Sequence, residues 1–193
     1  MNPYEIIEKY YEKGGDAYNI LVDHSVSVTE LALSMARKHP DLGLDLTFIS
    51  EAAMLHDIGI FRTAAAVLHC FGEHPYICHG YLGAEIMRQE GYPLHALVCE
   101  RHTGTGLSLA HILKENLPLP HRDMLPISKE EQLICFADKF FSKTHLGEQY
   151  TVEKARTKLL KFGDETIARF DEWCKIFLRF VILGGRVAAT DSF

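Results

Sequence analysis

Apolar residues recur at spacings of three and four along nearly the whole 193-residue chain, and no segment shows the apolar–polar alternation of a half-buried strand. Glycines and prolines divide this pattern into segments of helical length. Asn2-Pro3 places a capping residue before a proline at the first helical position, and Ser128 with Glu131 has the spacing of a capping box. The sequence therefore predicts an all-α fold, a compact helical bundle.

Helix starts and stops give the expected order of elements after a short N-terminal helix. We expect helices over residues 16–39, 45–57, 79–90, 93–102, 152–161 and 164–183, and one after Ser128 that carries "LICFADKFF". Asp45 suits the N-cap of the second of these helices, and Gly59 suits its C-terminal cap. Residues 61–78 are less regular and are expected to form a loop with a short helix.

The composition indicates one globular domain over residues 1–193, with a core at about 18–144 and C-terminal helices at 151–184 packed on it. The net charge of −6, without long basic runs, argues against a nucleic-acid polymer or an anionic membrane as partner. No apolar stretch approaches 18 residues, so no membrane span is expected. Five widely spaced cysteines favour reduced thiols and a cytoplasmic location.

The last helix carries many aromatic side chains. At helical spacing these side chains form mainly a core stripe, and any surplus would suit a homodimer contact. The stripe consists of Phe170, Trp173, Phe177 and Phe180, together with Leu178.

The helix "EAAMLHDIGI" ends in a histidine and an aspartate, His56 and Asp57, on its apolar side. Four further residues of these types share core-facing positions on other helices: His24, His79, His102 and Asp138. Any one of them alone reads as a hydrogen-bonded structural residue. Burying all six costs free energy unless they are paired or bound to metal, so together they predict a shared metal site. Imidazole and carboxylate ligands suit Fe, Mn, Ni, Zn, Co or Mg.

The ordered set, with the segments "DHSVSVTELAL", "AAMLHDIGI", "HGYLGAEIMRQEG" and "CFADKFFS", resembles the HD-domain superfamily of metal-dependent phosphohydrolases, in a small stand-alone HDIG-type form. The resemblance covers about residues 18–144. It implies a primary metal site made of His24, His56, Asp57 and Asp138.

The same resemblance leaves two roles open for His79 and His102: they hold a second ion bridged by Asp57, or they bind substrate beside a single ion. It implies hydrolysis of a phosphate ester of a small molecule or nucleotide by metal-activated water. Asp57 is then catalytic. Lys139, beside Asp138, is the first choice for a cation that stabilises phosphoryl charge, followed by Arg101 and Arg62.

Departures from family patterns narrow the substrate. The chain has "RHTGTGLS" where members that cleave cyclic di-GMP carry a glycine-tyrosine-proline signature, and Ile60 where members that split diadenosine tetraphosphate carry lysine. The glycines of "RHTGTG" fit either an anion-binding turn or a helix C-cap. His95 could support His102. The alternatives to a hydrolase are a non-catalytic nucleotide- or metal-sensing domain and a di-iron oxygenase of the same fold.

Overall fold

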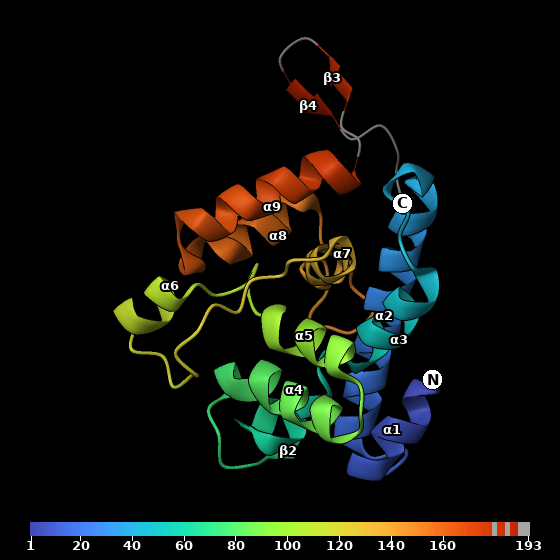
Figure 1. The fold of residues 1–193 in the computed structure, drawn as a ribbon, viewed down its shortest axis with the longest axis vertical. Helices are drawn as coiled ribbons and strands as arrows, with labels where there is room; N and C mark the ends of the chain where they lie inside the picture. The colour runs from blue at the N-terminus through green and yellow to red at the C-terminus, as the bar shows by residue number, and fades with distance from the viewer. Residues whose placement is uncertain (179–180, 184–185, 189–193) are drawn as a thin grey trace.

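The computed structural model describes residues 1–178, 181–183 and 186–188. Within these residues the fold is an all-α bundle with short 3-10 segments and very short strands, which confirms the predicted fold class (Figure 1). The helices are α1 (Pro3–Tyr10), α2 (Asp16–Lys38), α3 (Leu46–Leu55), α4 (His79–Gln89), α5 (Pro93–Arg101), α6 (Leu109–Lys114), α7 (Lys129–Asp138), α8 (Val152–Leu159) and α9 (Asp164–Phe177). The 3-10 segments are η1 (Pro40–Leu42), η2 (Ile58–Arg62), η3 (Ala66–Leu68), η4 (Tyr76–Cys78) and η5 (Leu160–Phe162).

The predicted caps are present. The Asn2 side chain accepts a hydrogen bond from the Tyr4 N–H, and Asp45 accepts one from the Phe48 N–H at 2.9 Å. Ser128 and Glu131 form both hydrogen bonds of a capping box at the start of α7. These caps satisfy N–H groups that have no partner inside the helix, so they fix where α1, α3 and α7 begin.

Two sequence predictions about secondary structure were wrong. The last helix ends at Phe177 instead of residue 183, and β3 (Val181–Leu183) pairs antiparallel with β4 (Arg186–Ala188). A second small hairpin, β1 (Ala64–Ala65) with β2 (Cys70–Phe71), lies within the segment expected to be a loop. β-Branched residues at 181, 182 and 187 and the Gly-Gly sequence at 184–185 disfavour a helix there. Phe180, named above in the aromatic stripe, lies outside the described residues.

Gly59 has a different role from the predicted helix cap. It lies inside η2, and a Cβ at this position would be 2.3 Å from the His79 carbonyl oxygen and 2.4 Å from the Gly83 N. Both distances are far shorter than any tolerated contact. The absence of a side chain therefore lets η2 pack directly against the first turn of α4, which carries His79.

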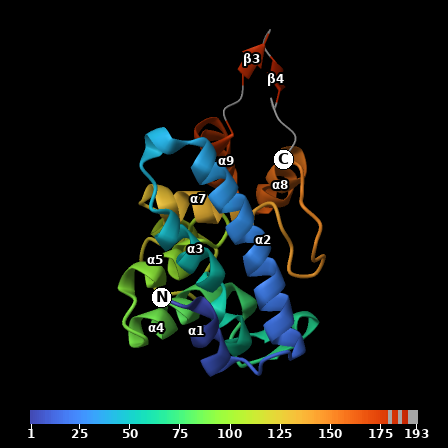
Figure 2. The ribbon, with the colours of Figure 1, turned by 90° about the vertical axis from the view of Figure 1, so that its right-hand side faces the viewer.

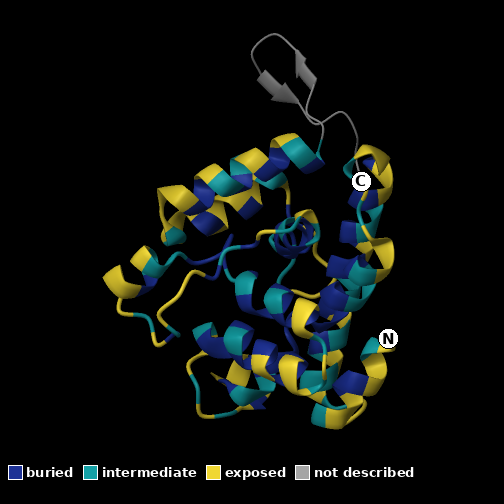
Figure 3. Ribbon diagram, in the orientation of Figure 1, coloured by how far each residue is buried: buried dark blue, intermediate teal, exposed yellow. Residues whose placement is uncertain are grey.

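Two apolar clusters meet along α2, the long blue helix in Figure 2. One joins the C-terminal half of α2 to α7, α8 and α9, and the other joins its N-terminal half to α1, α4 and α5. In the first cluster, Phe136 of α7 packs against Phe140, Phe170 and Phe177 at ring-centroid distances of 5.0–5.7 Å. The faces that these helices turn toward one another are buried, and their outer faces are exposed (Figure 3). His24 lies between Leu21 of one cluster and Val28 of the other, so polar residues occupy the seam.

Among the described residues, no helix is both long enough and apolar enough to cross a membrane.

Candidate metal centre

Five elements bring the six predicted ligands to one place. His24 comes from the middle of α2, His56 and Asp57 follow α3, and His79 opens α4. The remaining two, His102 and Asp138, lie at the C-terminal ends of α5 and α7. All six are buried, with exposed fractions between 0 and 9%.

The first group consists of His24, His56, Asp57 and Asp138. Their candidate ligand atoms lie within 4.8 Å of one another. His24 Nε2 is 2.9 Å from Asp138 Oδ1 and 3.3 Å from Asp57 Oδ2, and His56 Nε2 is 3.0 Å from the same Asp57 oxygen. Two imidazoles and two carboxylates that converge in this way match the ligand types of Fe, Mn, Zn and similar ions.

The second group shares Asp57 with the first and adds His79 and His102. Asp57 Oδ1 lies 3.4 Å from His79 Nε2 and 3.2 Å from His102 Nε2. One oxygen of Asp57 therefore faces each group, which is the arrangement expected of a carboxylate that joins two neighbouring sites.

Backbone carbonyls orient three of the four histidines by the same local contact. The Nδ1 atoms of His56, His79 and His102 lie 2.6–2.7 Å from the carbonyl oxygen three residues earlier. Because a carbonyl oxygen only accepts, each Nδ1 carries the hydrogen. In the neutral ring Nε2 is then left with its lone pair toward Asp57, as a metal ligand requires.

Several buried polar atoms here make no hydrogen bond: His56 Nε2 and both oxygens of Asp57. Lys143 and the imidazoles lie within ion-pair distance of Asp57 but do not have hydrogen-bond geometry to it. Leaving buried charged or polar atoms without hydrogen bonds is costly, and a divalent ion would satisfy all of these atoms together. The residues present therefore fit a metal centre.

The electrostatics without metal show strong coupling between these groups. Burial opposes ionisation of Asp57 and Asp138, yet neighbouring cationic side chains hold the pKa of each carboxyl well below its usual range. Burial also opposes protonation of His56, but Asp57 and Asp138 raise its pKa to about 9. Burial lowers the pKa of His79 to about 3 and lowers that of His102.

Two lysines lie at the edge of the centre. Lys139 Nζ is 2.7 Å from Asp138 Oδ2 and donates to the His102 carbonyl oxygen at 2.9 Å. Lys143 Nζ is 2.6 Å from Asp57 Oδ2. Lys139 was predicted from its place beside Asp138, but Lys143 was not, because it follows α7 by five residues in a segment without helical periodicity. The sequence "FADKFFSK" gives only the weak signal of a second lysine one helical turn beyond the first.

Tyr76 is a second residue that sequence reasoning missed. Its ring stacks on the His79 imidazole with centroids 4.6 Å apart and planes 19° apart. Burial raises the pKa of its hydroxyl to about 12, and Lys143 acts in the opposite direction. A neutral hydroxyl thus lies on the wall beside the second group of ligands.

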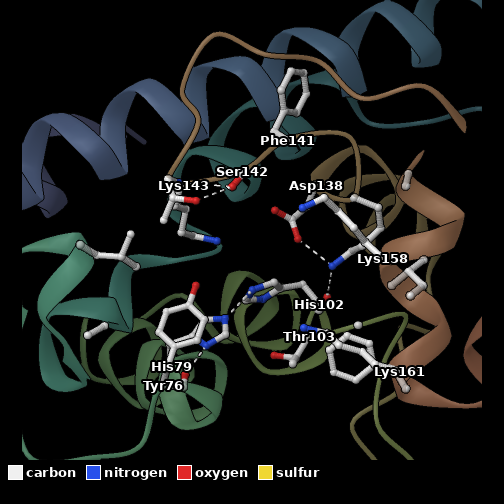
Figure 4. A pocket seen from close by; sticks show the side chains of 18 of the residues that line it. Tyr76, His79, His102, Thr103, Asp138, Phe141, Ser142, Lys143, Lys158 and Lys161 are labelled. Atoms are coloured by element: carbon white, nitrogen blue, oxygen red, sulfur yellow. Dashed lines mark hydrogen bonds and ion pairs between the residues drawn. The ribbon is translucent and has the colours of Figure 1, made fainter. Parts of the chain in front are cut away.

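The centre opens into a cavity of about 520 Å³ (Figure 4). His79, His102 and Asp138 are part of its lining, whereas His24, His56 and Asp57 lie behind them. Tyr76 and His79 lie on one side, and α8 with η5 forms the opposite side. The volume is in the range of small-molecule sites, so a ligand much larger than a phosphate group fits beside the metal ligands.

The other predicted cations do not line this cavity. Arg101 pairs with Glu131 at 2.9 Å, and Arg62 pairs with Glu85 at 3.2 Å. Their positions give no support to a role in phosphate binding. His95 pairs with Glu51 at 3.3 Å and makes no contact with His102, contrary to the suggestion made from spacing.

The two glycines of "RHTGTG" serve different purposes. Gly104, at φ +62°, turns the chain after α5, and with Thr103 it lines the cavity. Gly106, at φ +90°, allows a close approach of residues 124–126, since a Cβ there would lie 2.5 Å from Pro126. The first glycine therefore belongs to the site, and the second is explained by packing.

Fold and site together define a helical protein with a buried histidine–aspartate metal centre. The HD domain family model matches residues 21–142, and the chain belongs to this family. An uncharacterized protein of Methanocaldococcus jannaschii is 34% identical over 152 residues, which cover 77% of this chain and 82% of that protein.

Two further relatives are tRNA (cytidine(56)-2'-O)-methyltransferases. That of Thermoplasma volcanium is 30% identical over 86% of this chain and 45% of its own length. That of Picrophilus torridus is 30% identical over 67% of this chain and 34% of its own length. This chain thus spans less than half of either methyltransferase. No solved structure shows a significant match.

Proposed function

We propose that the protein is a divalent-metal-dependent phosphohydrolase that cleaves a phosphate ester of a small molecule or nucleotide. The observation that carries this proposal is the position of Asp57, with one oxygen toward each group of histidines and Lys143 beside it. When bound, the metal supplies hydroxide near neutral pH and polarises phosphate oxygens.

The residues of the chain have separate tasks in this reaction. His24, His56, Asp57 and Asp138 would hold one ion, and His79 and His102, together with Asp57, could hold another. Lys139 and Lys143 stabilise the negative charge that grows on the phosphoryl oxygens, because both ammonium groups border the cavity where that phosphate lies. The buried position of Asp57 behind the cavity lining keeps its carboxylate away from bulk water, which strengthens its hold on cations.

Elemental analysis of the purified protein, together with a panel of phosphomonoesters and phosphodiesters, tests the proposal. We expect bound metal and turnover in the wild type and loss of both in Asp57→Asn. Asp23→Ala, which removes an exposed carboxylate next to His24, serves as the control and should retain both.

If the metal content of the wild-type protein were no higher than that of Asp57→Asn, the proposal would be contradicted. Metal without turnover would favour the sensing alternative. Oxygen consumption by an iron-loaded protein would favour the oxygenase.

The names of the methyltransferase relatives, which refer to tRNA, suggest one addition to the panel. We propose that it include a short RNA with a terminal phosphate. A single terminal phosphate could reach the centre even though the net charge of −6 disfavours binding along a polymer.

A further inference from the structure

The cavity continues away from the metal centre toward α8 and η5, where it is lined by Lys158, Lys161 and Phe162. These residues lie outside the segment 21–142 that matches the family model. This outer part of the cavity is therefore built by the C-terminal helices, and the family match assigns it no role.

The charged residues that line the cavity are mostly basic. They are Asp138, which belongs to the metal centre, and four lysines: Lys139, Lys143, Lys158 and Lys161. The first two lysines are neutralised by Asp138 and Asp57. Among the described residues, neither Lys158 nor Lys161 has a carboxylate partner. Their ammonium groups lie over the rings of Tyr150 and Phe162, at 4.6 and 5.0 Å from the centroids.

The other basic residues of α8 differ from Lys158 in their ion pairs. Lys154, whose ammonium group lies over the same Tyr150 ring as that of Lys158, pairs with Glu148, and Arg156 pairs with Asp171. Lys158 and Lys161, which line the cavity, form no ion pair among the described residues, although Glu148 interacts with Lys158 at longer range. In a protein of net charge −6, such a cluster gives a local positive potential that attracts an anion.

Much of the remaining cavity lining is apolar. Val67 and Leu68 contribute from η3, Phe141 from the segment after α7, and Leu159 from α8. Thr103 lines the cavity beside Gly104. A ligand that extends from the metal centre to Lys158 and Lys161 would therefore meet charged groups at both ends, and an apolar spacer suits the rest of the lining.

We propose that Lys158 and Lys161 form a second anion subsite, and that the ligand carries two anionic groups separated by an apolar segment. One is the phosphate at the metal centre, and the other is a phosphate or carboxylate held by Lys158 and Lys161, which are labelled in Figure 4. This inference rests on the proposed function only for the placement of the first phosphate.

Binding of alkane bisphosphonates tests the subsite without turnover, because their P–C bonds are not phosphate esters. Calorimetry would compare each bisphosphonate, over a series of chain lengths, with the matching alkyl monophosphonate on the metal-loaded protein. We expect a bisphosphonate of suitable length to bind at least about tenfold more tightly than its monophosphonate. ω-Phosphonoalkanoic acids form a second arm, and equal preference for them would show that a carboxylate also suits the subsite.

The double variant Lys158→Met/Lys161→Met should lose this preference and bind monophosphonates as the wild type does. Lys154→Met/Arg156→Met removes the same charge from positions on α8 that do not line the cavity, and it should keep the preference. Lys158→Arg/Lys161→Arg, which retains the charge, should keep most of it. Thermal melting of each variant checks that it is folded.

No preference for a second anion at any chain length would overturn the subsite, as would an equal loss in both double variants that remove charge. Failure of the proposed hydrolysis would appear differently, as absence of turnover in the ester panel while the bisphosphonate preference and its dependence on Lys158 and Lys161 persist.

Discussion

Lys143 lies in the candidate site although the sequence gives only a weak signal for it. Its ammonium group lies 2.6 Å from Asp57, closer than any of the histidine nitrogens around that carboxylate. Burial opposes its protonation, but Asp57 raises the pKa of Lys143 above its usual value, so the ammonium group is charged near neutral pH. In the sequence it is one more lysine in a segment with no clear periodicity.

Replacing Lys143 by methionine should lower kcat/KM for a phosphate ester roughly 10²–10³-fold, the usual effect of removing one charged donor to a developing anion. Metal content should not fall, because Lys143 supplies no ligand atom. Steady-state kinetics and elemental analysis measure the two quantities. Lys175→Met, on the exposed face of α9, is the matched control and should change neither. Turnover unchanged in Lys143→Met would show that this ammonium group does not act on the substrate.

At the scale of elements, the centre depends on close packing between η2 and α4. Asp57 immediately precedes η2, and His79 is the first residue of α4, so the distance between these two ligands is fixed by the contact at Gly59. Neither residue type nor helical spacing in the sequence reports such a contact.

Gly59→Ala should therefore destabilise the protein by about 3 kcal/mol or more and lower its metal content, because the added methyl group meets backbone atoms that cannot move independently. Urea unfolding and elemental analysis measure both effects. Gly147→Ala is the comparison: it introduces only left-handed strain at φ +78° with open space around the Cβ, at a cost of about 1–2 kcal/mol. Similar losses for the two variants would argue against the close approach at Gly59.

At the scale of the whole molecule, the metal centre lies at the seam between two apolar clusters. Its ligands come from both sides of this seam: Asp138 lies on α7 in one cluster, and His79 begins α4 beside the other. A bound ion should therefore stabilise the entire fold rather than a single loop.

Removal of metal with EDTA should lower Tm by about 5–10 °C if the ion is present at about 100 times its dissociation constant. Differential scanning calorimetry with and without EDTA measures the shift, and readdition of the ion should reverse it. Asp57→Asn should show no EDTA-dependent shift. A wild type that melts at the same temperature with and without EDTA would contradict a role of metal in stability.

The metal-free protein should be most stable near pH 6.5. The pKa of His79 is about 3 in the folded protein, against an ordinary value of about 6.5. Below about pH 6.5 the unfolded chain therefore binds a proton at His79 that the folded protein does not bind, so the free energy of unfolding decreases as the pH falls. The depressed pKa values of Asp57 and Asp138 add to this loss below about pH 4. His56, with a folded pKa of about 9, contributes stability that is complete below about pH 6.5 and is lost as the pH rises toward 9.

Urea unfolding of the EDTA-treated protein at several pH values checks this curve, with slopes on the order of 1 kcal/mol per pH unit for each group. His79→Gln should flatten the acid side, while His121→Gln, an exposed histidine, should leave the curve unchanged. A stability that rises steadily from pH 5 to pH 9 would refute these assignments.

The sequence alone predicted the helical fold and the six candidate metal ligands that the structure brings together. Helical periodicity, caps and breaks are local properties, so α2, α3, α4, α5 and α7 could be predicted to within a few residues. The six ligands stood out because each is a polar residue on an apolar helix face, which is costly unless something in the fold satisfies it. The ordered pattern of these residues also sufficed to indicate the family.

Only the tertiary structure decided which other residues lie beside the six candidate ligands. Lys139 follows the predicted ligand Asp138, and Arg101 precedes the predicted ligand His102. Lys139 borders the cavity, whereas Arg101 pairs with Glu131. Lys143, Tyr76, Lys158 and Lys161 come to the cavity from segments far apart in the chain. Their roles depend on distances across the fold, and such distances follow from how helices pack rather than from spacing along the sequence.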